Sequence, residues 1–69
     1  MEFELREDSD YIELIQMLKA MNIAESGARA KEIVDEGQVE VNGTPESRKR
    51  AKLRKGDKVK VFGEIITIR

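Results

Sequence analysis

The sequence predicts a single small α+β domain spanning residues 1–69, in which two packed helices lie against a small antiparallel sheet of about four or five short strands. Three observations support this prediction. The hydrophobic period changes from two to 3.6 and back to two along the chain. A serine and a glycine stand where a second helix would begin and end, and an Asn-Gly pair marks a hairpin. At 69 residues, a chain buries only about 60% of its unfolded surface, which leaves room for one modest core.

The N-terminal third is expected to hold a short strand and then a helix. Phe3 and Leu5 alternate with charged residues, the period of a half-buried strand. Asp10 stands three residues before Glu13, an acidic variant of the capping-box spacing, so we expect a helix from about Tyr11 to Met21. At 100° per residue, the side chains predicted to face the core are those of Tyr11, Leu14, Ile15, Leu18 and Met21.

A second helix is expected from Ser26 to about Glu36. The Ser26 hydroxyl is suited to accept a bond from a free N–H of the first turn, and Gly37 is suited to the left-handed conformation that ends a helix. The linker of residues 22–25 allows only a tight connection, so the two helices should pack together.

The rest of the chain is predicted to form strands. Val39 and Val41 lead into Asn42-Gly43, a strong hairpin signal, whereas Pro45 restricts the return segment to a short edge strand. A basic loop anchored by Ala51 and Leu53 should follow, and then a turn at residues 55–57. Two further strands, at 58–62 and 65–69, are expected to join at Gly63-Glu64.

Charge is distributed unevenly along the chain, although the net charge is only −1. Residues 1–40 carry four bases and eleven acids, a net charge of −7, and residues 41–69 carry nine bases and three acids, a net charge of +6. Between Arg48 and Lys60 there are eight bases and one acid, Asp57. Such a local potential predicts a polyanion as the partner of the basic region.

The amino-acid composition argues against several classes of function. The chain has no Cys and no His, which removes the commonest catalytic groups and any metal or redox motif. We therefore expect no enzyme activity, no metal and no cofactor. No apolar run exceeds two residues and the N-terminus is acidic, which argues against a membrane span or a signal peptide. The expectation is a cytoplasmic monomer.

From Leu14 to Val61, the chain resembles a known RNA-binding domain. The residues that carry the resemblance are the runs LIQMLKAMNIAESGARAKEIVDEGQVEVNG and KGDKVKV. They resemble the domain shared by bacterial ribosomal protein S-four, pseudouridine synthases and tyrosyl-tRNA synthetases, and most of all its short, stand-alone, ribosome-associated members. The resemblance implies that the helix pair is an αL-type RNA-binding motif. It also implies that the chain binds structured RNA, either ribosomal RNA or a ribosomal particle. A ribosomal protein is an alternative partner on other grounds, namely the acids at the end of the second helix.

The resemblance places RNA contacts at the N-terminal end of the second helix and in the neighbouring loops. Two positions depart from the family pattern: Gly27 and Glu13 stand where relatives usually carry Arg. Both departures remove positive charge, so we expect residues 48–55 to provide most of the affinity and the helix mainly to position them. The predicted RNA-contacting residues are Ser26, Gly27, Arg29, Lys31, Arg48, Lys49, Arg50, Lys52, Arg54 and Lys55.

Some of these residues also have simpler, purely structural interpretations. Ser26 is suited to act as a helix cap and nothing more, and Lys31 has the spacing of an ion pair with Asp35. The acids at the end of the second helix, Glu32, Asp35 and Glu36, oppose the helix dipole and call for compensation, either by the protein's own basic loop or by a basic partner protein.

Two other functions remain as alternatives. One is a protein-interaction adaptor that docks through its acidic face, and the other, less favoured, is a double-stranded DNA binder. With Tyr11 predicted in the core, stacking platforms for single-stranded bases are nearly absent, and duplex or folded RNA fits better than a linear sequence.

Overall fold

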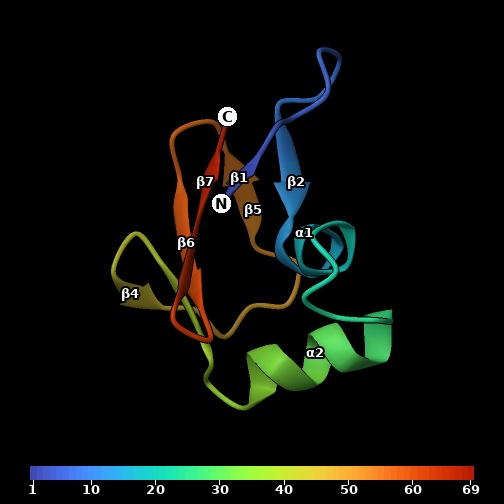
Figure 1. Ribbon diagram of the computed structural model, residues 1–69, viewed down its shortest axis with the longest axis vertical. Coiled ribbons are helices and arrows are strands. Elements are labelled where there is room, and N and C mark those ends of the chain that lie inside the picture. Colours follow the sequence, from blue (N-terminus) through green and yellow to red (C-terminus); the bar gives the residue numbers. More distant parts are fainter.

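The computed structural model describes residues 1–69 and contains two helices and seven strands (Figure 1). In chain order the elements are β1 (Glu2–Phe3), β2 (Tyr11–Glu13), α1 (Leu14–Ala20), α2 (Gly27–Asp35), β3 (Val39–Val41), β4 (Thr44–Pro45), β5 (Lys52–Arg54), β6 (Lys58–Val61) and β7 (Glu64–Ile68). Two helices packed against short strands confirm the predicted α+β class.

Five of the strands form one sheet, in the order β1, β7, β6, β3, β4. Three of its four pairings are antiparallel, as predicted, but β1 pairs with β7 in parallel. This parallel pairing aligns Phe3 with Ile68, and both side chains then pack on the core. Strand β4, which contains Pro45, lies at the edge of the sheet as predicted, where the missing N–H costs least.

The first helix begins later than predicted. Residues Tyr11 to Glu13 form β2, which pairs antiparallel with β5 in a separate two-stranded ribbon. Ile12 faces Leu53 across this ribbon, and Leu53 is fully buried. Strand pairing therefore overrides the helical period of these residues. Tyr11 is 40% exposed instead of lying in the core, and the predicted acidic cap is wrong because no side chain caps α1.

The basic region also differs in detail from the prediction. Lys52 to Arg54 form β5 and are not part of a loop, although Ala51 and Leu53 are buried anchors as predicted. The connection between β6 and β7 is Phe62-Gly63, not Gly63-Glu64, because Glu64 already pairs with Val61 in the ladder. Phe62 and Gly63 both have positive φ (51° and 79°), as a type I′ hairpin turn requires.

The predicted limits of α2 and the following hairpin are confirmed. The Ser26 hydroxyl oxygen accepts a bond of 3.1 Å from the Arg29 N–H, which caps the helix. Gly37 has a φ of 73° and follows the last turn. Asn42 and Gly43 have φ values of 53° and 83°, the type I′ turn expected from an Asn-Gly pair.

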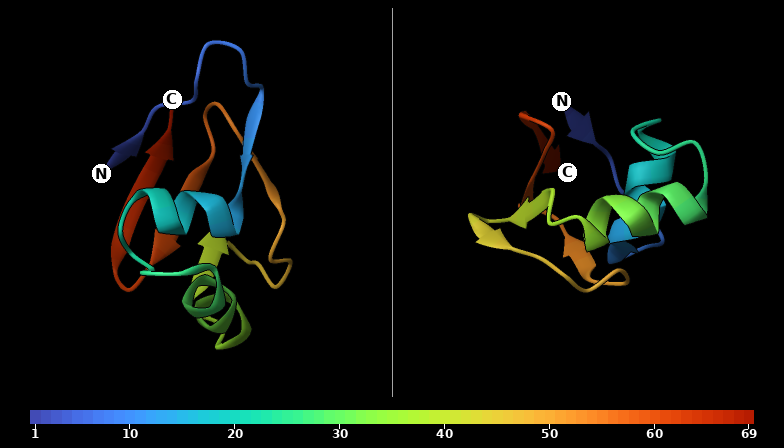
Figure 2. Two further views of the ribbon diagram at one scale, coloured as in Figure 1. Left: turned by 90° about the vertical axis from the view of Figure 1, so that its right-hand side faces the viewer. Right: turned by 90° about the horizontal axis from the view of Figure 1, so that it is seen from below.

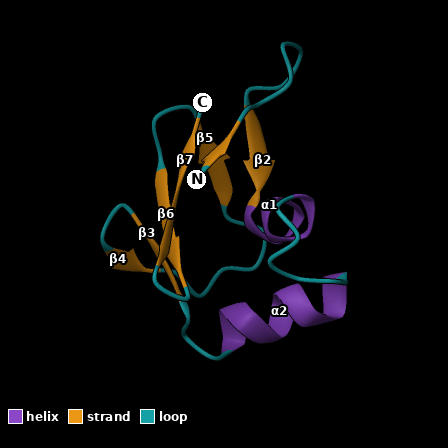
Figure 3. Ribbon diagram, in the orientation of Figure 1, coloured by secondary structure: helices purple, strands orange, loops and turns teal.

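One hydrophobic core joins the helices to both sets of strands. Figure 3 shows α1 and α2 lying together at the lower right, the strands of the five-stranded sheet towards the left, and β2 directly above α1. Buried residues come from α1, α2, β3, β5, β6 and β7 and form a single cluster, and no polar or charged residue is buried in it. Neither helix is long and apolar enough to cross a membrane. All the charged side chains are therefore displayed around a small apolar centre.

Candidate nucleic-acid interface

The basic loop, residues 46–51, is held against the start of α1 by its backbone. The Leu14 N–H donates to the Ala51 carbonyl at 2.8 Å, and the Ile15 N–H donates to the Lys49 carbonyl at 3.2 Å. These carbonyls satisfy N–H groups that a helix leaves free at its first turn, which explains why α1 has no side-chain cap. Ala51 is 6% exposed and anchors the loop further. The loop therefore has a fixed path beside α1 and α2 (Figure 2).

Each of the three consecutive cations at the centre of the basic loop forms an ion pair within the protein. We call Arg48, Lys49 and Arg50 the paired triplet. Their guanidinium and ammonium groups contact carboxylates from three different parts of the chain. The pairs are Arg48 with Glu46 at 3.1 Å, Lys49 with Asp35 at 2.9 Å, and Arg50 with Glu13 at 3.5 Å.

The Glu46 carboxylate is the most enclosed of these partners. It accepts bonds from the Arg48 backbone N–H at 3.0 Å and from the Arg48 guanidinium at 3.1 and 3.2 Å. These bonds, the side-chain bond first, lower the pKa of Glu46 below its ordinary value. The same pairing raises the pKa of Arg48. Glu46 therefore fixes the entry to the basic loop as well as neutralising one of its charges.

The acids at the end of α2 are compensated within the protein. Asp35 contacts the basic loop through its pair with Lys49, which confirms the intramolecular alternative for this residue. Arg29 lies near Glu32 at 3.7 Å and Glu36 at 3.8 Å, on its own helix. Lys31 forms no ion pair, so the pair with Asp35 suggested by their spacing is absent.

The next cations along the chain form no ion pairs. We call Lys52, Arg54 and Lys55 the open cations. Lys52 and Arg54 point to the exposed face of β5, because the residue between them, Leu53, faces the core. Lys55 lies in the β5–β6 turn and borders the acidic N-terminal segment at a groove shared with Glu4, Glu7 and Asp10.

The turn that carries Lys55 is built around Asp57. The Asp57 carboxylate accepts the Arg54 backbone N–H at 2.8 Å and the Asn42 side-chain N–H at 3.1 Å. Asn42 in turn accepts the Lys58 backbone N–H at 2.9 Å. The single acid of the basic stretch thus serves as a hydrogen-bond acceptor that joins the β3–β4 and β5–β6 turns.

An open groove of about 570 Å³ is shared by two members of the paired triplet and two of the open cations. Its lining contains four cations and no acid. The lining residues are Arg48, Arg50, Ala51, Lys52 and Arg54. The groove is a continuous positive surface, the type of surface that attracts a phosphate backbone.

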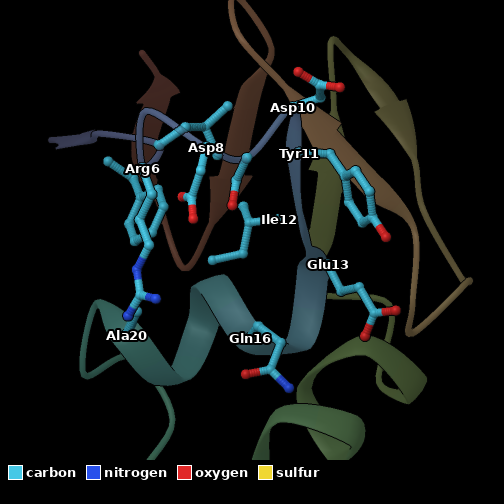
Figure 4. A pocket seen from close by; sticks show the side chains of 11 residues that line it. Arg6, Asp8, Asp10, Tyr11, Ile12, Glu13, Gln16 and Ala20 are labelled. Carbon is cyan, nitrogen blue, oxygen red and sulfur yellow. The ribbon is translucent and has the colours of Figure 1, made fainter.

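A second groove, of about 650 Å³, has the opposite character (Figure 4). It lies between the N-terminal segment, β2 and α1, and it combines apolar side chains such as Leu5 and Ile12 with the carboxylates of Asp8, Asp10 and Glu13. The only basic side chain in its lining is Arg6. Although this groove is larger, its charge is wrong for a polyanion.

The N-terminal end of α2 is separated from the basic loop. Lys49 meets α2 at Asp35, at the far end of the helix from Ser26, so the nine residues of α2 place the two sites about 13 Å apart. The N–H groups of Gly27 and Ala28 have no acceptor within the protein. A Cβ added at Gly27 would meet nothing within 4 Å, so the space beside this end of the helix is open.

Tyr11 lies beside the open cations Lys52 and Arg54, although it was predicted to lie in the core. On β2 it faces Arg54, its register partner on β5. The signal that was overlooked is the alternation of Ala51 and Leu53 with Lys52 and Arg54, which indicates a strand but is obscured by the run of charges. A strand at 52–54 needs a pairing partner, and β2 supplies it.

Comparison with known proteins agrees with this arrangement. The S4 domain family matches residues 3–69. The YbcJ protein of Escherichia coli (strain K12) is 41% identical over 58 residues, which cover 84% of this chain and 83% of YbcJ. The Bacillus subtilis (strain 168) protein named "Probable ribosome maturation protein RlbA" is 39% identical over 56 residues, which cover 81% of this chain and 79% of that protein.

The fold also matches a solved structure. The solution structure of YbcJ from E. coli, which contains an αL motif involved in RNA-binding, superposes with a TM-score of 0.73 at 39% identity. The match covers 97% of this chain and 84% of YbcJ. These findings confirm the resemblance to short S-four-like proteins and the assignment of the helix pair to an αL motif. The chain therefore belongs to the S4 domain family.

Proposed function

We propose that this chain is a non-catalytic, cytoplasmic, monomeric RNA-binding module for structured RNA, with ribosomal RNA or a ribosomal particle as its target. RNA contacts the basic loop, the exposed face of β5 and the N-terminal end of α2. Residues 1–69 act as one binding domain.

The observation that carries the proposal is the groove lined by four cations and no acid. Arginine guanidinium groups bind phosphate oxygens bidentately and also stack on unpaired bases, whereas a lysine ammonium acts as a point charge. Both types line the groove. The names of the relatives support the proposal further, since YbcJ has a motif involved in RNA-binding and RlbA is named for ribosome maturation.

The two alternatives receive less support. A double-stranded DNA binder that inserted α2 into a major groove would bring Glu32, Asp35 and Glu36 towards phosphates, which would repel them. An adaptor docking through its acidic face would have to compete with existing contacts, because these three carboxylates already form ion pairs within the protein.

Crosslinking in the host tests the proposal most directly. The protein is crosslinked to RNA by ultraviolet light in living cells, and the attached fragments are sequenced. We expect a small number of recurring ribosomal RNA segments, each with a predicted hairpin or junction. Fragments distributed in proportion to the abundance of all cellular RNA would contradict a specific ribosomal target.

A second measurement separates the alternatives in vitro. Titration of the protein with a ribosomal RNA hairpin, the DNA hairpin of the same sequence and the matching DNA duplex should give the highest affinity for RNA. Equal affinity for the DNA duplex would favour the DNA alternative. Absence of binding to all three, together with co-purification of a basic ribosomal protein, would favour the adaptor.

A further inference from the structure

Tyr11 presents an aromatic ring on the outer face of the β2–β5 ribbon. Its register partner is Arg54, and the next register pair, Ile12 and Leu53, turns to the opposite, apolar side. Figure 4 shows the ring directed away from Ile12, on the other side of β2. Tyr11 is 40% exposed, and its hydroxyl makes no hydrogen bond within the protein. Core packing therefore does not account for an aromatic residue at this position.

Two of the open cations flank the ring. The Lys52 ammonium lies 4.9 Å from the ring centroid and the Arg54 guanidinium carbon lies 5.7 Å from it. Both cations also line the positive groove, which continues from them to Arg48 and Arg50, whereas the ring itself borders the acidic groove. An aromatic face thus lies beside two cations that belong to the positive groove, the combination that binds an unpaired base together with its phosphates.

A base can displace a cation from the ring. An exposed cation–π contact contributes roughly a 2- to 5-fold effect on an equilibrium constant. Stacking of a base on an aromatic side chain contributes about 5- to 150-fold to binding. A displaced Lys52 ammonium has phosphates of the same strand within reach, because its side chain is long and exposed. The exchange therefore favours the base.

We propose that Tyr11 is a stacking platform for one unpaired nucleobase of the bound RNA, with Lys52 and Arg54 on the adjacent phosphates. This rests on the proposed RNA-binding function and makes it more specific. The target contains a loop, bulge or end whose base is free, because a base inside a continuous duplex is covered on both faces and cannot reach the ring. Of the two expected targets, duplex or folded RNA, an exposed Tyr11 favours folded RNA with an unpaired base over a continuous duplex.

The wild-type chain contains its own reporter for this contact. Tyr11 is the only tyrosine and there is no tryptophan, so the tyrosine fluorescence of the protein comes from the platform alone. Two probes are titrated: a short RNA hairpin with an unpaired loop, and the same stem as a blunt RNA duplex. N-acetyltyrosinamide, measured in parallel, corrects for light absorbed by the RNA. We expect the hairpin to quench the emission when it binds and the duplex to leave it nearly unchanged.

Variants test the energetic part of the proposal. Tyr11→Leu keeps an apolar side chain but removes the ring, and it should lower the affinity for the hairpin about 5- to 150-fold while changing the affinity for the duplex by less than about 2-fold. Tyr11→Phe keeps the ring and should restore most of the hairpin affinity. Phe62→Leu is the matched control, since Phe62 is an exposed aromatic (51%) at the β6–β7 turn of the five-stranded sheet. Circular dichroism establishes that each variant is folded.

The outcomes separate this proposal from the one on which it rests. Hairpin binding without quenching of Tyr11, or with unchanged affinity in a folded Tyr11→Leu, would overturn the platform and leave RNA binding intact. An equal loss in Phe62→Leu would also overturn it. If neither RNA binds the wild type, the proposed function fails and the platform fails with it. Because the quenching measurement uses the wild-type chain, it decides the matter even if Tyr11→Leu does not fold.

Discussion

The paired triplet and the open cations are adjacent in the sequence and carry the same formal charge, but their surroundings differ. Every member of the paired triplet contacts a carboxylate, and the partners come from β2, α2 and the first residue of the basic loop. No open cation forms an ion pair. Lys52 and Arg54 lie instead over an aromatic ring. The local density of charge in a sequence therefore differs from the charge that is free to meet a ligand.

The difference matters because an RNA phosphate that binds a paired cation must first displace its carboxylate, which costs free energy. An exposed salt bridge is typically worth about 0 to 1 kcal/mol, so a phosphate can displace the carboxylate. The displaced carboxylate stays beside the phosphate and repels it, however. Lys52 and Arg54 have no ion-paired carboxylate to displace, and Lys55 has none either, although it borders Glu4, Glu7 and Asp10. We therefore expect the open cations to provide more of the RNA affinity than the paired triplet, which refines the expectation that residues 48–55 act together.

The largest effect should follow from removing the open cations. On single-stranded RNA each phosphate contact changes log K by about 0.7 for each tenfold change in salt, so three contacts are worth roughly 100-fold in affinity between about 1 M and about 0.1 M salt. Replacing all three open cations by Gln should lower the affinity for an RNA hairpin by about this factor at the lower salt. Fluorescence anisotropy of a labelled hairpin measures it.

The matched control is the paired triplet replaced by Gln, which removes the same formal charge. We expect a loss of roughly 10-fold or less, because each cation is already compensated. A greater loss from the paired triplet than from the open cations would reverse the comparison. Thermal unfolding of both variants checks that neither loss reflects a damaged fold.

A gain of affinity should follow from releasing the paired triplet. Glu13→Gln with Asp35→Asn frees Arg50 and Lys49 without changing the size of either partner. Two freed contacts should raise the affinity for the hairpin by up to about 25-fold at about 0.1 M salt. Glu64→Gln is the control, since Glu64 forms no ion pair and the change in net charge per site is the same. An equal gain per site from Glu64→Gln would mean that net charge alone determines affinity.

A smaller gain is expected at the start of α2. Gly27→Arg adds a cation at the first residue of the helix, and no neighbour obstructs its Cβ. One added phosphate contact should raise the affinity about 5-fold at about 0.1 M salt. Stability should change little, because the better helix propensity of Arg, up to about 1 kcal/mol, opposes the unfavourable cation at a helix N-terminus, about 0.3 to 1 kcal/mol. Gly27→Gln is the uncharged control, and an equal gain from it would remove charge as the cause.

The smallest effect concerns the pH dependence of stability at Glu46. Its pKa is lowered in the folded state by the bonds from Arg48, so its contribution is fully present above about pH 4.5 and is lost as the pH falls through the folded-state value. Glu46→Gln should therefore be slightly less stable than the wild type at neutral pH and equally stable in strong acid. Urea unfolding at several pH values measures the difference. A difference that persisted unchanged into strong acid would mean that the carboxylate charge is not its source.

Local signals in the sequence were sufficient for much of the fold. Ser26, Gly37 and the Asn42-Gly43 pair each act through their own backbone, so their roles could be predicted without knowing the rest of the structure. The predictions failed where the secondary structure of a residue depends on pairing with a distant segment. Tyr11 has the spacing of a helix face, but pairing with β5 more than forty residues later makes it part of a strand. No local pattern reveals that partner.

The candidate site shows the same division. The sequence predicted which cations gather in residues 48–55, because a charge run is visible directly. It did not predict which of them are paired, since Glu13 and Asp35 reach the basic loop only after β2 and α2 have packed beside it. It also missed Tyr11, whose exposure depends on the same β2–β5 pairing. Whether a cation is free to bind a ligand depends on the tertiary structure, whereas the local density of charge can be read from the sequence.

The salt dependence of hairpin binding tests the difference between the two groups of cations most directly. The slope of log K against log salt concentration is measured for the wild type and for the two Gln variants of the paired triplet and the open cations. Loss of the open cations should make the slope shallower by about 2, as expected for three phosphate contacts on a single strand, and loss of the paired triplet should make it shallower by less than about 1. A larger change for the paired triplet, or equal changes for both, would contradict the account.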